Sequence, residues 1–206
     1  CEKTCNCPNR CARKFQGCSC AHDKKSKSAL ADLVCFEDDR CLCFQLGREC
    51  DPDLCGSCGV TEVLDPVYRY NKAVQKTRCC NASIQRGVPK RTLLGDSGVH
   101  GLGLYAGEDI KEHEFVGEYK GEVITREEAE RRGAVYHHQN LSYLFSLNAT
   151  QEIDSTYFGN KIRFINHARY GKQNLYPRIF FVNTVHRIAL FAAKDISSGQ
   201  ELLFDY

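Results

Sequence analysis

Residues 163–167 read RFINH, and residues 201–206 read ELLFDY. In the first stretch, Asn166 and His167 follow directly on an apolar run, and the second stretch closes on Tyr206, an aromatic residue with a hydroxyl. Taken separately, a histidine in the core and a packed tyrosine are the plainer interpretations. Their meaning therefore depends on what else the chain carries.

Two further stretches lie upstream, GLG at residues 101–103 and EYKGE at residues 118–122. A dinucleotide-binding loop needs G-x-G-x-x-G after a strand and at the start of a helix. Residues 104–110 (LYAGEDI) predict a strand and a turn instead. Gly101 and Gly103 therefore either let the backbone approach a ligand closely or form a turn.

The second half of the chain is cysteine-free and predicts mainly short strands. Residues 114–119 and 121–124 predict strands broken by glycine, and residues 178–182 and 187–193 flank a hairpin turn at 183–186. Because strands and helices do not alternate, a doubly wound α/β fold is disfavoured.

One helix is well marked in this half. Thr125 and Glu128 form a capping box, which predicts a helix beginning there. Gly133 is expected to end this helix after Arg132.

Composition narrows the class of protein. The chain has 206 residues, of which 42% are hydrophobic and 26% charged, and its net charge is +2. It has no run of eighteen apolar residues, which excludes a transmembrane helix. The near-neutral charge excludes a strongly basic nucleic-acid tail as the main activity.

All fourteen cysteines lie between Cys1 and Cys80, which divides the chain into residues 1–80 and 81–206. Cysteines at this density form either disulfides or a metal site. Three C-x-C pairs favour metal, because a disulfide across one residue is strained. The segment is also too polar to fold by burial alone, so zinc thiolates are expected to hold it together.

The run of nine cysteines from Cys5 to Cys50 fits a compact cluster. Three zinc ions reach four ligands each if three of nine sulfurs bridge two metals. Cys55, Cys58 and Cys79, with Cys1, are assigned to a second cluster. The predicted zinc ligands are Cys1, Cys5, Cys7, Cys11, Cys18, Cys20, Cys35, Cys41, Cys43, Cys50, Cys55 and Cys58.

The cysteine pattern resembles the CXC (tesmin-like, pre-SET) domain, and the four later stretches together resemble the SET-domain signature. Over the whole chain the sequence is most similar to the Enhancer of zeste family, the catalytic subunits of Polycomb repressive complex two. Supporting phrases are RECDPDLC at 48–55, SIQRG at 83–87, EAERRG at 128–133 and GNKIRF at 159–164. Heterochromatin-type SET proteins, whose pre-SET spacing differs, are the alternative within the class.

The resemblance implies a mainly β SET-domain fold with short helices, preceded by an irregular zinc-cluster CXC domain. It implies a histone-lysine N-methyltransferase that transfers methyl from S-adenosylmethionine to histone H3, at lysine 27, for Polycomb gene silencing in the nucleus. The implied partners are the H3 tail and nucleosome, Suz-type and WD40-repeat subunits, and a weak DNA contact from the cysteine-rich domain, with no membrane. A non-catalytic zinc-cluster module that binds chromatin is the competing hypothesis.

The resemblance also implies site residues. The catalytic set is Tyr206, whose hydroxyl lies beside the transferred methyl, and Tyr119, Phe204 and Phe145, which wall the lysine channel. The cofactor-binding set is Gly101, Leu102, Gly103, Asn166, His167, Ser142 and Tyr143.

Three positions depart from the family pattern. Gln139 stands where animal relatives have a channel tyrosine, and Ile165 stands where a small alanine is common. Leu102 replaces a tryptophan, which removes a stacking contact to the cofactor. The first two departures bear on which methylation state the enzyme prefers.

Overall fold

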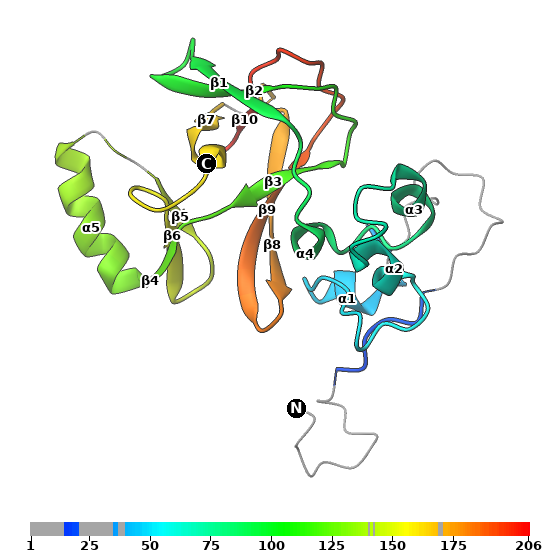
Figure 1. Ribbon diagram of the computed structural model, residues 1–206. Coiled ribbons are helices and arrows are strands. Elements are labelled where there is room, and N and C mark those ends of the chain that lie inside the picture. The colour runs from blue at the N-terminus through cyan, green and yellow to red at the C-terminus, as the bar shows by residue number, and fades with distance from the viewer. Residues whose placement is uncertain (1–14, 21–34, 37–39, 140, 142, 169–170) are drawn as a thin grey trace. The chain divides into compact units, whose positions relative to one another are not determined.

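The computed structural model describes residues 15–20, 35–36, 40–139, 141, 143–168 and 171–206. Two compact units make up the chain, Cys1–Arg86 and Gly87–Tyr206 (Figure 1). The domain limits expected from the cysteines, 1–80 and 81–206, stay a prediction. Among the described residues, no helix has both the length and the apolar character needed to cross a membrane.

The first unit contains short helices around a core of sulfur. Its helices are α1 (Leu42–Gln45), α2 (Val60–Leu64), α3 (Lys72–Thr77) and α4 (Ser83–Arg86). Eight cysteines that are at most 6% exposed form most of its buried cluster, with Val60, Val63 and Ala82 as the other buried members. Helices this short are not stable alone, so their positions depend on these tertiary contacts.

A buried carboxylate fixes the start of α4. Glu49 is 4% exposed, and its side chain accepts hydrogen bonds from the backbone N–H of Ile84 at 2.6 Å and of Gln85 at 3.0 Å. These N–H groups have no partner within the helix, and the positive end of the helix dipole favours the negative charge. Glu49 therefore ties the RECDPDLC and SIQRG stretches together.

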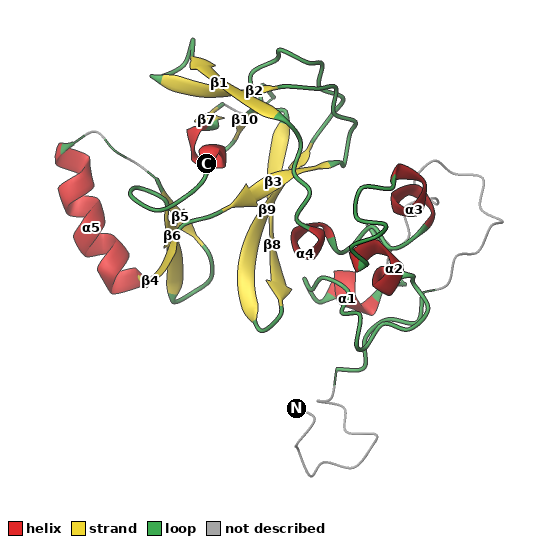
Figure 2. Cartoon of the chain, viewed as in Figure 1, coloured by secondary structure: helices red, strands yellow, loops and turns green. Residues whose placement is uncertain are grey.

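The described residues of the second unit form ten short strands, one helix and one 3₁₀ turn, whose arrangement is shown in Figure 2. The strands are β1 (Thr92–Asp96), β2 (Leu102–Ala106), β3 (Phe115–Tyr119), β4 (Glu122–Thr125), β5 (Leu144–Ser146), β6 (Gln151–Asp154), β7 (Asn166–His167), β8 (Leu175–Val182), β9 (Val185–Ala192) and β10 (Leu203–Phe204). They form the sheets β1-β2, β3-β9-β8, β4-β6-β5 and β7-β10. The expected mainly β fold with short helices is confirmed.

The β8-β9 hairpin turns more tightly than expected. Asn183 and Thr184 both have positive φ, 46° and 73°, and Val182 pairs directly with Val185. Two consecutive left-handed residues form the two-residue turn that matches the twist of antiparallel strands. The turn therefore contains residues 183 and 184 alone, and β9 begins at Val185, inside the turn expected at 183–186.

The core of the second unit is formed by apolar side chains from strands far apart in the sequence. Leu104 of β2, Ile188 and Leu190 of β9, and Leu202 are each 0% exposed. They belong to one buried cluster that also contains Tyr119. This core fixes the elements around which the aromatic residues of the site are placed.

Helix α5 (Arg126–His138) begins as expected and continues past the expected end. The Thr125 side chain accepts a hydrogen bond from the Glu128 backbone N–H, as the capping box predicts. The prediction that Gly133 ends the helix is wrong, because the helix runs on to His138 and caps at Gln139. Gly133 has ordinary helical geometry, and contacts of later residues with the sheet hold this part of the helix in place.

Replacement of Gly133 by alanine is expected to stabilise the protein by about 0.5–1 kcal/mol, because glycine in a helix interior loses more backbone entropy on folding. A Cβ at this position would meet only Leu144 Cδ1, at an ordinary 3.4 Å. Thermal unfolding of the Gly133→Ala variant measures the change. A lower melting temperature would show that the added methyl strains the contact with Leu144.

Candidate functional site

The described cysteines of the first unit gather into overlapping groups of sulfur atoms. The three groups are Cys18 with Cys35, Cys50 and Cys58; Cys18 with Cys43, Cys50 and Cys55; and Cys18 with Cys20, Cys35 and Cys41. Within each group all sulfurs lie within 4.8 Å of one another. Shared members are what a cluster with bridging thiolates requires.

This arrangement corrects one expectation. Cys55 and Cys58 were assigned to a separate second cluster, but they share groups with Cys18 and Cys50. The chain folds back after Cys50 through a turn in which Cys55 N–H bonds to Asp51 O at 2.8 Å, so both sulfurs return to the same centre. Of the other predicted ligands, Cys1, Cys5, Cys7 and Cys11 lie outside the described residues.

Close packing of these thiols shifts their pKa values. The sulfurs of Cys18 and Cys35 form a hydrogen bond at 3.8 Å, and this contact lowers the pKa of Cys18 and raises the pKa of Cys35. Buried thiolates at this spacing repel one another, so a metal cation is the chemical partner that allows all of them to ionise. The residues present therefore fit zinc, the metal expected at such a thiolate set.

The Cys50→Ser variant is expected to lose about one zinc ion or more per chain and to unfold at a lower temperature. Cys50 is 0% exposed and belongs to two of the three sulfur groups. Cys80→Ser is the matched control, because the Cys80 thiol faces backbone carbonyls and belongs to none of the groups among the described residues. Elemental analysis measures the zinc, and equal zinc content in both variants would contradict the assignment.

In the second unit, Asn166 secures the turn between β1 and β2. Its side-chain amide donates to the backbone carbonyls of His100 at 3.2 Å and Leu102 at 3.0 Å, and it lies 3.4 Å from the Glu201 carboxylate. Ser97 donates to that same carboxylate at 2.5 Å. The Asn-His stretch and the GLG stretch are thus brought together.

Glu201 also explains one glycine. A Cβ at Gly103 would lie 2.3 Å from Glu201 Oε1 and 3.0 Å from Ser97 Cβ, so a larger residue there would displace this carboxylate. Gly101 has a φ of +49° and open space around it. Gly101 therefore has the conformation of a turn, whereas Gly103 accommodates a carboxylate of the chain itself, and the approach of either glycine to a ligand stays a prediction.

His167 and Tyr206 meet beside this turn. The Tyr206 backbone N–H donates to His167 Nδ1 at 3.3 Å, and the rings pack edge to face at 5.3 Å. The Tyr206 hydroxyl donates to Ile165 O at 2.8 Å. Although 66% of Tyr206 is exposed, burial around its hydroxyl, with Tyr143 nearby, raises the pKa of Tyr206, so the phenol is protonated at neutral pH.

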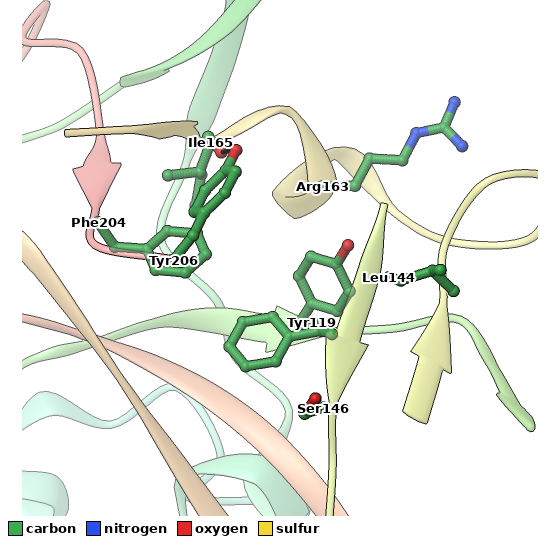
Figure 3. Close-up of a pocket in the computed structure, with 8 residues that line it drawn as sticks. Tyr119, Leu144, Ser146, Arg163, Ile165, Phe204 and Tyr206 are labelled. Carbon is green, nitrogen blue, oxygen red and sulfur yellow. Dashed lines mark hydrogen bonds between the residues drawn. The ribbon is translucent and has the colours of Figure 1, made fainter. Parts of the chain in front are cut away.

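A cavity of about 230 Å³ opens next to these residues (Figure 3). It is lined by Tyr119, Leu144, Phe145, Ser146, Arg163, Ile165, Phe204 and Tyr206. The four residues of the expected catalytic set are all in this lining. Arg163 extends its guanidinium away from Tyr119, Phe204 and Tyr206 (Figure 3). The guanidinium carbon lies over the rings of Tyr143 at 5.1 Å and Phe164 at 4.7 Å.

Aromatic rings form one continuous wall of the cavity. Phe145 stacks on Phe204 with centroids 5.7 Å apart and planes 12° apart. Tyr119 lies 5.2 Å from Phe145, and Tyr206 lies 4.8 Å from Phe204. Burial raises the pKa of Tyr119 to about 12, so this wall carries no negative charge at neutral pH.

The three departures from the family pattern occupy different environments. Ile165 is 1% exposed and lines the cavity. Leu102 is 47% exposed in the turn that Asn166 holds. Gln139 caps α5, is exposed and is absent from the cavity lining.

Of the expected cofactor-binding residues, Ser142 lies outside the described residues.

Sequence reasoning missed several contributors. Glu201 and Ser97 hold the turn through their side chains, and Arg163 and Ser146 line the cavity. Leu144 also lines it. Residues of these types are common at the ends of strands in any sequence. Only their contacts in the folded chain show that they belong to the site.

Comparison with known proteins confirms the architecture. The SET domain family matches residues 101–206 and the CXC domain family matches residues 17–60. The chain belongs to the SET-domain family. The SET match begins at the GLG turn and ends at Tyr206, so it includes the described cavity.

Relatives of this SET-domain chain include histone-lysine N-methyltransferase EZH2 of Chaetomium thermophilum, which is 42% identical over 220 residues. The match covers 100% of this chain and 14% of that protein. Histone-lysine N-methyltransferase MEDEA of Arabidopsis thaliana is 37% identical over 206 residues, covering 100% of this chain and 28% of that protein. The expected resemblance is therefore confirmed, while the chain spans only a minor part of these relatives.

Solved structures show the same fold for the SET-domain chain. A structure described as ctPRC2 in an autoinhibited conformation bound to S-adenosylmethionine is 41% identical, with a TM-score of 0.86, and the match covers 100% of this chain and 26% of that one. An active polycomb repressive complex 2 in the basal state is 43% identical, with a TM-score of 0.79, covering 94% and 24%.

The Gly103→Ala variant is expected to destabilise the SET domain by about 1–3 kcal/mol, because its methyl collides with a carboxylate that is already bound. Gly98→Ala is the matched control, since a Cβ at Gly98 has nothing within 4 Å. Thermal unfolding compares the two. Equal melting temperatures would mean that Glu201 moves aside without loss.

Proposed function

We propose that this chain is the catalytic part of a protein-lysine methyltransferase that acts on the histone H3 tail, at lysine 27, as in the Enhancer of zeste proteins it resembles. The observation that carries the proposal is the aromatic cavity lined by Tyr206, whose backbone N–H bonds to His167, the residue that follows the Asn166 that holds the turn. The relatives named as histone-lysine N-methyltransferases support the same reaction.

S-adenosylmethionine is the proposed cofactor, and when bound it supplies the methyl group on a sulfonium for in-line displacement by nitrogen. The turn at residues 97–103 fits this group, because Cβ atoms at Gly98 and Gly101 would have nothing within 4 Å, so the backbone there is open to a ligand. Gly101, Leu102 and Gly103 would offer that backbone. Asn166, His167 and Tyr143, with Ser142, complete the proposed binding set.

The cavity suits a lysine side chain for two reasons. Its stacked rings favour the desolvated, neutral amine that can attack carbon, and they attract a methylated ammonium through their π faces. Tyr206 is protonated at neutral pH, so it acts as a hydrogen-bond donor and positions groups near Ile165 O. Positioning of this kind accounts for much of the rate of a displacement reaction.

Ile165 is proposed to limit how many methyl groups the cavity accepts. It is buried in the lining where the family commonly has alanine, so the space beside Tyr206 is smaller. Gln139 is not in the lining in this structure, which leaves Ile165 as the departure that directly shapes the cavity among the described residues.

The cellular setting follows from the relatives. We infer a nuclear protein of Polycomb gene silencing that works with Suz-type and WD40-repeat subunits on nucleosomes, with a weak DNA contact from the cysteine-rich unit. Zinc, proposed as three ions, holds that unit together. The match to the CXC family favours this assignment over the heterochromatin-type SET proteins.

The test is methyl transfer from radiolabelled S-adenosylmethionine to nucleosomes by the full-length protein in its complete complex. The Tyr206→Phe variant is expected to lower the turnover about 100-fold or more, because one positioned hydroxyl is removed from the reacting groups. Its affinity for S-adenosylmethionine, measured by calorimetry, should change little.

Replacement of lysine 27 of H3 by arginine tests the position that is methylated. Loss of the label would support lysine 27, and label on another residue would favour a different H3 lysine. A folded, zinc-bound complex that transfers no methyl to any histone would favour the competing chromatin-binding module.

A further inference from the structure

An ionic cluster fastens helix α5 to the middle strand of the β4-β6-β5 sheet. Asp154, at the end of β6, is 1% exposed. Its carboxylate accepts hydrogen bonds from Arg132 at 2.8 Å, from the Tyr136 hydroxyl at 2.8 Å and from the Thr156 backbone N–H at 2.9 Å. Two of these three donors come from α5.

The helix has little apolar anchorage of its own. Its buried residues are Ala129 and Tyr136, and it packs on β4 and β6 (Figure 1). Because the apolar contact is small, the polar contacts of Arg132 and Tyr136 decide how the helix lies on the sheet.

Arg132 is the central cation of the cluster. It contacts Glu128 at 2.7 Å, Glu122 at 2.9 Å and Asp154 at 2.8 Å. Burial alone would raise the pKa of Asp154, but the hydrogen bonds from Thr156, Arg132 and Tyr136 outweigh it and lower the pKa. Asp154 is therefore ionised at neutral pH, and a buried carboxylate is tolerated only while these partners remain.

The cluster continues directly into the wall of the cavity. Ser155, which follows Asp154, donates its backbone N–H to Tyr143 O at 3.0 Å. The Tyr119 hydroxyl donates to the same carbonyl at 2.9 Å. Arg163 donates to the carbonyls of Ser155 at 2.6 Å and Thr156 at 2.8 Å. Two lining residues, Tyr119 and Arg163, are thus held by the segment that Asp154 places.

We propose that Arg132 and Asp154 are positioning residues that couple helix α5 to the Tyr119 side of the cavity. The inference rests on the proposed function, because it assigns these residues a role in methyl transfer. They touch neither the cavity nor the turn held by Asn166, so they act through residues 155–156 and Tyr143.

The coupling has a specific kinetic consequence. Displacement of the cavity wall by about 1 Å costs up to about 100-fold in rate, whereas the cofactor turn is held by different contacts. Loss of the cluster therefore lowers the turnover and leaves the affinity for S-adenosylmethionine unchanged.

The experiment compares Arg132→Gln and Asp154→Asn with the unsubstituted full-length protein in its complex. Each variant is expected to lower kcat about 10-fold or more, with the cofactor Kd within about twofold of the original. The double variant should lose no more than the worse single variant, because two residues that act as a unit are not additive.

Arg131→Gln is the matched control. Arg131 lies on the same helix and bonds to Glu128 at 2.6 Å, but it does not bond to Asp154, which takes its helix contacts from Arg132 and Tyr136. Its kcat should stay within about twofold of the original. A loss as large as that of Arg132→Gln would overturn the proposal, and so would fully additive losses in the double variant.

Hydrogen exchange supplies a readout that does not depend on activity. In Arg132→Gln, amides in residues 143–146 and 153–156 should exchange faster, while Arg131→Gln leaves them unchanged. If the unsubstituted complex transfers no methyl, the proposed function fails, and exchange still decides the coupling. Unchanged exchange in Arg132→Gln would overturn the coupling even in an active enzyme.

Discussion

A parallel pairing of two very short strands supports the whole candidate site. β7 and β10 pair over two residues each, Asn166 with Leu203 and His167 with Phe204. Parallel strands need a long connection between them. The pairing of β7 with β10 therefore brings together two segments separated by residues 168–202, although it contains few hydrogen bonds. It brings Asn166, His167 and Tyr206 to one place.

Side chains compensate for the small number of backbone bonds in this pairing. Asn174, 7% exposed, donates to Glu201 O at 2.8 Å and accepts from Leu203 N–H at 2.8 Å. On the other side, Leu202 N–H bonds to Leu104 O at 2.7 Å. Residues 201–203 therefore bond to β2 on one side and to Asn174, just before β8, on the other. These contacts fix where Tyr206 lies.

The two units reach stability by different physical means. The second unit buries aliphatic residues such as Leu104 and Leu190 completely, which removes apolar surface from water. The first unit buries cysteine sulfurs. Thiolates this close together repel one another unless a metal ion binds them. A change of pH or of metal supply is therefore expected to act on the first unit before the second.

The sequence named most of the candidate site residues in advance, through its resemblance to a known family. The GLG, EYKGE, RFINH and FDY stretches pointed to Tyr119, Asn166 and Tyr206 through their resemblance to the SET-domain signature, and the roles of these residues stay a prediction. Strands β3, β8 and β9 and the Thr125 cap also followed, since alternation and capping are local properties. The sequence likewise located the sulfur-rich region through its spacing.

Only the tertiary structure decided the rest, because it depends on contacts between residues distant in the chain. Gly133 reads locally as a helix end, yet α5 continues because Arg132 and Tyr136 bond to Asp154, 22 and 18 residues away. Cys55 and Cys58 read as a separate pair, yet their sulfurs return to Cys18 and Cys50. Composition and order determined which chemistry is present, while long-range packing decided which groups meet.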